Sequence, residues 1–404
     1  MKFYNKKLRS SAILQSLLIA TLVFALLSAI LLFFDKQQTV NSKIEQNILI
    51  NHEFQNMVEF SKSPISESDN SSWKPQSIAS SLLSVKNFGL LNVYTGYIKT
   101  EQDTFYKGWA IGYADKHWPA IYLAGNFDEL KYTGKAEIFG EAFLPSKSVK
   151  EVYIEGKSST VQDFLKSKPK QSDRDFPKEI KETITNIRNT AKRLTGFGNT
   201  RLLSEFNSDT IRNSFRSNPL IIQIDQPLSR PSVFEGNIIL KSNTPLSIPS
   251  SITINSGIVA APEIRLEAGF KGSGQFWATD SLFISSMAQL NYPSHIVVTG
   301  ENGYAEIDEG SEYNGEIFLT EKKSFIKIGD KSTVKGNIIT NGDIQLQGEV
   351  QGSVFAQRFY LKTPTGVYTN TLMDGIINHD MHQKDFLSVT MKGSQKGKVM
   401  KWLN

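Results

Sequence analysis

The chain has no cysteine, only five histidines and little net charge. Without thiols, disulfide scaffolds, thiolate zinc sites, iron–sulfur clusters and thiol nucleophiles are excluded. The 45 Lys and Arg against 40 Asp and Glu give a net charge of +5, too small and too dispersed to indicate a nucleic-acid partner. Hydrophobic residues are 39% and charged residues 21% of the 404 positions, which leaves a surplus of uncharged polar residues and glycine. This composition favours β-structure with many turns.

The N-terminus carries a basic leader followed by one long apolar run. Four Lys and Arg residues lie within the first nine positions, and the stretch 12–34 is uncharged. As a helix this stretch would span about 34 Å, enough to cross a hydrocarbon core of about 30 Å. It is too long and ends too bulkily for a cleaved signal peptide. The positive charges before it predict a single-pass anchor in the cell (inner) membrane, with a cytoplasmic N-terminus and the C-terminal region extracytoplasmic.

Composition shifts divide the chain into six predicted segments. They are a cytoplasmic tip and transmembrane helix at 1–34, a stalk and linker at 35–84, a β-rich region at 85–157, a helical insertion at 158–229, a β-helix at 230–378 and a C-terminal tail at 379–404. The helical insertion is predicted because Ile180, Ile184 and Ile187 recur at helical spacing after Pro177. In the β-rich region, alternation around Ala136 and Ile138 predicts that the solenoid begins before this insertion.

The most specific pattern lies in the C-terminal half, where two of every six positions are small or apolar over six consecutive hexads. Alternation inside a hexad points two side chains to one face of a strand, and the next two residues turn a corner. This period predicts a mainly β fold, a parallel β-helix with three sides and about 18 residues per coil. The residues expected to hold the coil geometry are Ile252, Ile254, Ile258, Ile264, Leu266, Phe270, Phe276, Leu282 and Ile284.

A second pattern has the form apolar-x-Gly-(Asn/Glu)-Ile and occurs at 234–238, 313–317 and 334–338. Strict alternation continues it through 344–356. Glycine at an inward or corner position lets the chain pass where a Cβ would clash, and it tolerates positive φ. The glycines expected in this role are Gly236, Gly315, Gly336, Gly348 and Gly352.

The repeat over about 230–360 resembles the bactofilins, a family of polymer-forming bacterial β-helix proteins. The resemblance implies a hydrophobic-cored β-helix that self-associates end to end as a scaffold and uses no nucleotide. The spanning helix, the β-rich region and the helical insertion depart from that family. The basic leader and apolar helix also resemble type IV pilin-like proteins over about forty residues. Here the leader lacks the Gly before the processing site, and Gln15 stands about where those proteins carry Glu.

Few residues in the chain suggest chemistry. His379 and His382 are the candidate metal ligands, although the sequence shows no second ligand cluster nearby, so we expect no metal and no cofactor. There is no G-x-S-x-G motif for a serine hydrolase. The acids expected on the outer face of the coils are Glu263, Glu267, Asp280, Glu306, Asp308, Glu309, Asp343 and Glu349. A solenoid places polar residues outward in any case, so scattered carboxylates do not by themselves predict catalysis.

The sequence therefore predicts a non-enzymatic, membrane-anchored, extracytoplasmic scaffold or interaction protein of the bacterial cell envelope. Its expected partners are membrane lipid at 12–34 and either a second copy or an envelope protein. One alternative is a minor pilin-like component of a secretion assembly. The other is a polysaccharide-active enzyme, which requires two carboxylates and a basic residue to converge within ~10 Å on one outer face.

Overall fold

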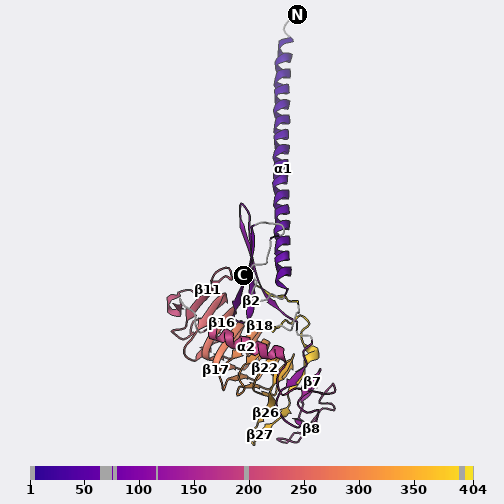
Figure 1. Cartoon of the computed structure of the whole chain (residues 1–404). Helices are drawn as coiled ribbons and strands as arrows, with labels where there is room; N and C mark the ends of the chain where they lie inside the picture. Colours follow the sequence, from indigo (N-terminus) through magenta and orange to yellow (C-terminus); the bar gives the residue numbers. More distant parts are fainter. Residues whose placement is uncertain are drawn as a thin grey trace.

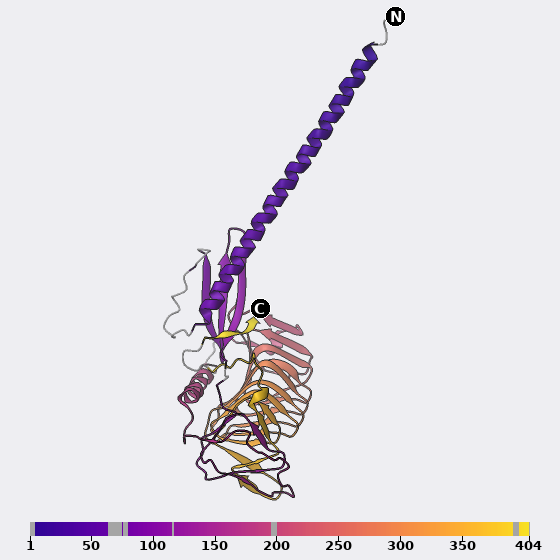
Figure 2. The ribbon, with the colours of Figure 1, turned by 90° about the vertical axis from the view of Figure 1, so that its right-hand side faces the viewer.

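The computed structural model describes residues 5–63, 75, 80–114, 117–194, 200–390 and 396–403. A long N-terminal helix carries a small antiparallel sheet, and a parallel β-solenoid of about 11 turns lies at the end of the helix away from the N-terminus (Figures 1 and 2). The prediction of a mainly β chain with a parallel solenoid, a long apolar N-terminal helix and one further helix is confirmed.

Helix α1 (Asn5–Ser61) extends far beyond the apolar stretch. It is long and apolar enough to cross a membrane, a test that a signal sequence near the N-terminus also passes. Within the apolar stretch, the hydroxyls of Ser16, Thr21 and Ser28 each donate to a carbonyl of their own helix at 2.9 Å. The helix continues without a break past the apolar stretch to Ser61, through part of the segment predicted as a stalk. The linker predicted after it lies largely outside the described residues.

The last turns of α1 pack on a four-stranded antiparallel sheet of order β1-β2-β3-β30. Its strands are β1 (Ser81–Phe88), β2 (Leu91–Lys99), β3 (Thr104–Gly112) and β30 (Lys398–Leu403). The indole of Trp109 donates to Ser61 Oγ at 2.9 Å, and the Ser81 hydroxyl donates to the buried Glu53 carboxylate at 2.7 Å. These contacts fix the sheet to the stalk. The tail predicted at 379–404 is thus partly a strand, because β30 finds its partner in β3, nearly 300 residues earlier.

The solenoid has three inward ladders, one for each side of the coil. One contains Leu290, Tyr313, Val334, Val350, Ile377 and Ile138; the second contains Ile296, Ile317, Ile338, Val354, Ile121 and Ala142; the third contains Leu282, Ala305, Ile326, Ile344 and Phe359. All of these residues belong to one continuous apolar core. The predicted tube filled by paired side chains is therefore present, with three sides.

The strands of the solenoid fall into two stretches of chain. The later stretch contains β10 (Arg201–Leu202), β11 (Thr210–Asn213), β12 (Leu220–Gln223), β13 (Ser232–Gly236), β14 (Ile238–Lys241), β15 (Leu246–Ile248), β16 (Ile252–Leu266), β17 (Lys271–Ile284), β18 (Gln289–Val298), β19 (Tyr304–Ile307), β20 (Glu312–Leu319), β21 (Phe325–Ile328), β22 (Thr333–Thr340), β23 (Asp343–Leu346), β24 (Glu349–Gln351), β25 (Val354–Ala356), β26 (Arg358–Lys362), β27 (Val367–Thr369), β28 (Thr371–Met373) and β29 (Ile376–Asn378). The earlier stretch contains β4 (Ile121–Leu123), β5 (Leu130–Thr133), β6 (Glu137–Phe139), β7 (Ala142–Leu144), β8 (Val149–Glu151) and β9 (Lys170–Gln171).

The order of the coils in space differs from their order in sequence. β4 pairs in parallel with β25, and β6 pairs with β29, so residues 121–171 stack beyond the C-terminal coils. The predicted β-rich region at 85–157 is thus divided, because 81–112 belongs to the antiparallel sheet and the rest to the far end of the solenoid. Coils also begin at β10, inside the segment predicted as a helical insertion at 158–229.

Helix α2 (Lys178–Leu194) runs along the outside of the solenoid from the far coils back toward the first coils (Figure 1). Phe176, just before it, lies against Tyr122 of the far coils, and Leu194 lines a pocket with Trp277. Seventeen residues at 1.5 Å give about 25 Å, and the five coil steps between these points give about 24 Å at ~4.8 Å each. The predicted helix is confirmed, and its buried residues are Ile180, Ile184, Ile187 and Leu194.

Candidate functional site

The residues predicted to hold the coil geometry lie in the lumen with one instructive exception. Ile252, Ile254, Ile264, Leu266, Phe270, Phe276, Leu282 and Ile284 are buried in the main core. Ile258 is also buried, but it belongs to the cluster on the outside of the coil, where it pairs with Ile239. The pairing of β16 shifts between Asn255 and Gly257, and Ser256 has φ +65°. This irregularity moves the alternation by one residue, so that Val259 points inward in place of Ile258.

The repeat glycines lie where neighbouring coils approach most closely. Gly315 has φ +150°, and a Cβ there would lie 1.8 Å from the carbonyl oxygen of Ser294. Gly336 has φ +141°, and a Cβ would lie 2.0 Å from the oxygen of Gly315. Glycine is required by both conformation and space at these two positions. At Gly236, Gly348 and Gly352 a Cβ would lie within 2.5 Å of backbone oxygen.

In each of five successive coils, the residue just after the position of the repeat glycine is polar and lies on the outside of the coil. Together these residues form a polar column. Successive coils contribute Gln275, His295, Glu316, Asn337 and Ser353, and all of them are buried. Outward polar residues of a solenoid usually face water. Here they are covered by the antiparallel sheet and by the segment at 386–390, which bridges to Tyr113 after β3. The column is thus the junction between the solenoid and the sheet.

At one end of the junction, Gln275 recognises the turn between β1 and β2. Its Oε1 accepts from the Leu90 amide at 2.8 Å, and its Nε2 donates to the Phe88 carbonyl at 2.8 Å. Gly89 in that turn has φ +59°, and a Cβ there would lie 2.0 Å from Gln275 Oε1. Gln275 is 2% exposed, so water competes little for these hydrogen bonds, and they fix the hairpin on the solenoid.

In the middle of the junction, Glu316 anchors the 386–390 segment. Its carboxylate accepts from the Ser388 hydroxyl at 2.6 Å and from the Val389 amide at 2.8 Å. Tyr292 adds a second attachment, because its hydroxyl donates to the Leu387 carbonyl at 2.9 Å and accepts from the Leu387 amide at 3.1 Å. The 386–390 segment leads to β30, so these contacts also determine where the last strand of the sheet lies.

His295 lies beside Glu316, with its Nε2 3.7 Å from Glu316 Oε2. Burial lowers the pKa of His295 to about 3, so the imidazole is neutral at physiological pH. The neighbouring Tyr313 hydroxyl reaches the carbonyl oxygens of Ser294 and Glu316 at 2.9 and 2.7 Å. Burial raises the pKa of Tyr313. His295 therefore takes part in the column as a neutral, structural group.

The histidines predicted as weak metal candidates lie at the far end of the same column. The rings of His379 and His382 stack at 5.6 Å. His379 Nδ1 lies 3.3 Å from Ser353 Oγ, and His382 Nδ1 lies 3.0 Å from the Gln351 carbonyl. Among the residues that the structure describes, no group of three or more potential metal ligands occurs. The contacts of His379 and His382 with Ser353 and Gln351 hold their segment against the coils.

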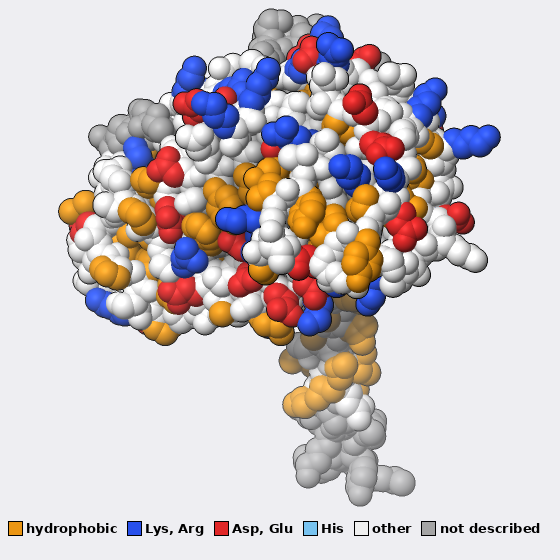
Figure 3. All heavy atoms as spheres, turned by 90° about the horizontal axis from the view of Figure 1, so that it is seen from below, with side chains coloured by type: hydrophobic (Ala, Val, Ile, Leu, Met, Phe, Trp, Pro, Cys, Tyr) orange, Lys and Arg blue, Asp and Glu red, His pale blue; other side chains and the backbone are white. Residues whose placement is uncertain are grey.

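Four of the eight predicted outer acids, Glu263, Glu306, Glu309 and Asp343, pair with cations on the same or the next coil. Glu306 contacts Lys327 at 2.7 Å, and Asp343 contacts Arg358 at 3.0 Å. Two acids and a base meet at Lys331, which contacts Glu309 at 2.8 Å and Asp330 at 3.9 Å, but all three side chains are more than half exposed. Ion pairs exposed to solvent in this way contribute little to the free energy of unfolding. On the side of the molecule seen in Figure 3, acidic, basic and hydrophobic side chains are interspersed.

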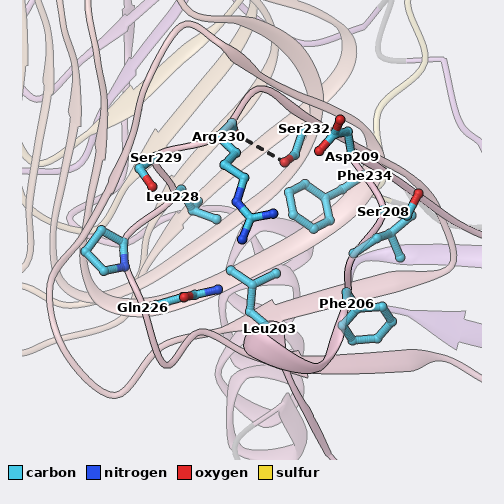
Figure 4. Close-up of a pocket in the computed structure, with 12 residues that line it drawn as sticks. Leu203, Phe206, Ser208, Asp209, Gln226, Leu228, Ser229, Arg230, Ser232 and Phe234 are labelled. Atoms are coloured by element: carbon cyan, nitrogen blue, oxygen red, sulfur yellow. Dashed lines mark hydrogen bonds between the residues drawn. The ribbon is translucent and has the colours of Figure 1, made fainter.

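The end of the lumen at the first coils contains a small cavity of about 120 Å³ (Figure 4). Phe234 lines it from the core, and Leu203 and Phe206 pack against that core from the 3₁₀ turn at Leu203–Glu205. Arg201 lies over the Phe206 ring at 4.2 Å. The opening of the tube is thus covered by a short, partly charged cap, as solenoid ends require for solubility.

Comparisons with models of known protein families, with curated proteins and with solved structures found no match. The class of protein is therefore given by the fold alone, as a β-solenoid joined through a buried polar junction to a sheet on a long apolar helix.

Proposed function

We propose that this chain is a single-pass membrane protein whose solenoid serves as a non-enzymatic, extracytoplasmic scaffold or interaction surface. The observation that carries the proposal is the junction. Gln275 exchanges hydrogen bonds with the turn of the sheet, and Glu316 accepts hydrogen bonds from the 386–390 segment that leads to β30. The sheet is fixed to α1 by Trp109 and Glu53. A rod held at a set position by buried contacts suits presentation of a surface rather than a mobile tether.

The topology of this proposal is testable because the chain contains no cysteine. A cysteine at Asn302, an exposed turn of the solenoid, should react with a membrane-impermeant maleimide in intact cells. A cysteine at Asn5 should react only after the cells are permeabilised. The reverse labelling would place the solenoid in the cytoplasm, and release of the labelled chain without its first residues would identify a cleaved signal sequence.

The scaffold role is tested by electron microscopy of the full chain in lipid nanodiscs. Particles with the solenoid at one orientation to the disc support a fixed presenting surface, and filaments would add the self-association that the bactofilin-like repeat implies. Broadly distributed orientations would contradict the proposal. The cap over the first coils favours discrete particles, because it covers the lumen that end-to-end stacking of coils would continue.

A second candidate, a component of a pilin-like assembly, is favoured by α1. Val40, Ile44 and Ile48 are all more than half exposed and lie four residues apart, so the apolar surface continues beyond 12–34 along one side of the helix. Such a helix could join a bundle through its first half while its second half holds the sheet. If 12–34 is replaced by an unrelated spanning helix, a simple anchor keeps its function, whereas an assembly component is lost from its complex.

A further inference from the structure

A cleft of about 520 Å³ lies between β30 and the first coils of the solenoid. Lys401, Trp402 and Leu403 line it from β30, and Arg212, Glu235 and Asn255 line it from the coils. Its volume is within the range of ligand-binding clefts in proteins. None of these residues takes part in the polar junction described above.

The cleft runs along the edge of a strand. Consecutive side chains of a strand point to opposite faces, so a cavity touched by three consecutive residues lies beside the strand rather than over one face. β30 is the last strand of its sheet and pairs with β3 on one side only. Among the described residues no strand pairs with its other side, which leaves backbone donors and acceptors that an added strand can use.

The charge of the cleft favours an acidic occupant. Arg212 is paired with Glu235 at 2.7 Å, whereas Lys401 has no ion pair within 4.0 Å in the described part of the chain. Burial lowers the pKa of Lys401, and the more distant Glu235 partly opposes this shift. A carboxylate brought into the cleft would restore the interactions that this ammonium loses on burial.

An apolar surface adjoins this charge. The side chain of Trp402 is 57% exposed, although its ring lies 6.0 Å from that of Trp109 in the sheet. Phe215 lines the cleft from the coils. An exposed tryptophan beside an unpaired strand edge offers a contact for the side chain of an extended peptide.

We propose that an extended peptide of a partner protein adds to the free edge of β30 as a fifth strand and places an acidic side chain at Lys401. Backbone hydrogen bonds give affinity in this mode of recognition, and alternate side chains give specificity. A second copy of β30 is a poor occupant, because Lys398 and Lys401 would repel the same lysines of that copy. The inference deepens the proposed interaction role and concerns only the surface that makes the contact.

The test uses the full chain in detergent micelles and a fluorescein-labelled peptide of sequence TVTVEVTVT. We expect saturable binding by fluorescence anisotropy, weakened about tenfold when the central Glu is replaced by Lys and abolished when alternate valines are replaced by proline. Lys401→Gln should weaken binding of the Glu peptide about tenfold and remove its preference over the Lys peptide. Lys398→Gln is the matched control, since Lys398 is exposed on the same strand but does not line the cleft, and it should keep the preference.

Hydrogen exchange locates the bound peptide. We expect protection of amides at 399–403 in the complex and no change at the solenoid's far coils. Binding that is insensitive to proline, or equal in both lysine variants, would overturn the strand-addition proposal. A chain that dimerises and excludes the peptide would show that the edge is occupied by a second copy. Either result leaves the membrane topology and the rigid junction untouched, so this failure is distinguishable from failure of the proposed function.

Discussion

Removal of the Glu316 carboxylate is the sharpest test of the junction. In Glu316→Ala the Ser388 hydroxyl and the Val389 amide lose an acceptor at 2.6 and 2.8 Å in a place where the side chain is 1% exposed. Hydrogen bonds to a charged group contribute about 1.5–3 kcal/mol each, and a donor left unpaired in the interior keeps its desolvation cost. The segment cannot simply detach, because Tyr292 and the bridge between Tyr113 and Ser388 still hold it. We therefore expect a loss of about 3–5 kcal/mol in the free energy of unfolding.

Urea unfolding of the full chain in detergent measures the total, and hydrogen exchange at the Val389 amide measures the local effect. A local loss of about 2 kcal/mol corresponds to roughly 30-fold faster exchange. Glu309→Ala is the matched control, because Glu309 is also a carboxylate on the outside of the coils with a bonded partner, Lys331, but it is 59% exposed; its loss should change stability by less than about 0.5 kcal/mol. Equal effects of the two substitutions would show that the buried carboxylate is not what holds the segment.

Two further outcomes follow from the same coils. His295 has a pKa of about 3 when folded and about 6.5 when unfolded, so its neutral form stabilises the fold fully above pH 6.5, and this contribution is lost as the pH falls toward 3. Urea unfolding should therefore show a loss of about 2 kcal/mol from His295 between pH 7 and 5. His295→Gln should remove this part of the pH dependence of the free energy of unfolding. Gly315→Ala should cost about 2–4 kcal/mol in thermal unfolding, because its Cβ meets the Ser294 carbonyl, whereas Gly366→Ala, with its nearest neighbours at 3.6 Å, should be close to neutral.

Local periodicity in the sequence was sufficient for the parts of the fold that depend on neighbours in the chain. Alternation identifies which residues face the lumen, and the spacing of Ile180, Ile184 and Ile187 identifies α2. A fixed period of 18 residues was not kept: Ile264 and Leu282 are 18 apart, but Ile296, Ile317 and Ile338 are 21 apart. Extra residues inserted at the corners leave the inward ladders intact. The number of residues per coil can therefore vary, whereas the alternation of side chains within each strand cannot. At Ser256 the irregularity falls within the strand itself, which is why Ile258 was assigned to the wrong side.

Partners distant in the sequence could not be derived from such patterns. Val354 pairs with Ile121, and β30 pairs with β3, and each of these segments alternates like any other strand. The polar column is visible in the sequence, but its pattern also fits ordinary solvent-exposed residues of a solenoid. Glu316 and Asn337 follow the repeat glycine at equivalent places, which the sequence explains equally well as outward residues in water. Only the cover above them, contributed by β1, β2 and the 386–390 segment, makes them a buried junction.

The path of the chain shows which parts of the molecule the junction connects. Residues 121–171 form the far coils, and α2 runs from them back toward the first coils. The later coils then stack from the first ones back to the far ones, and the last segment crosses to the sheet (Figure 2). Closure of the far end therefore requires β25 to pair with β4, more than 200 residues earlier in the chain. The entropy cost of closing such a loop grows only slowly with its length. The crossing segment at 386–390 ties the completed solenoid to the strand that β30 adds to the sheet. The same segment thus couples closure of the coils, completion of the sheet and formation of the cleft beside β30, so loosening Glu316 should weaken peptide binding at Lys401 even though the two side chains belong to different sites.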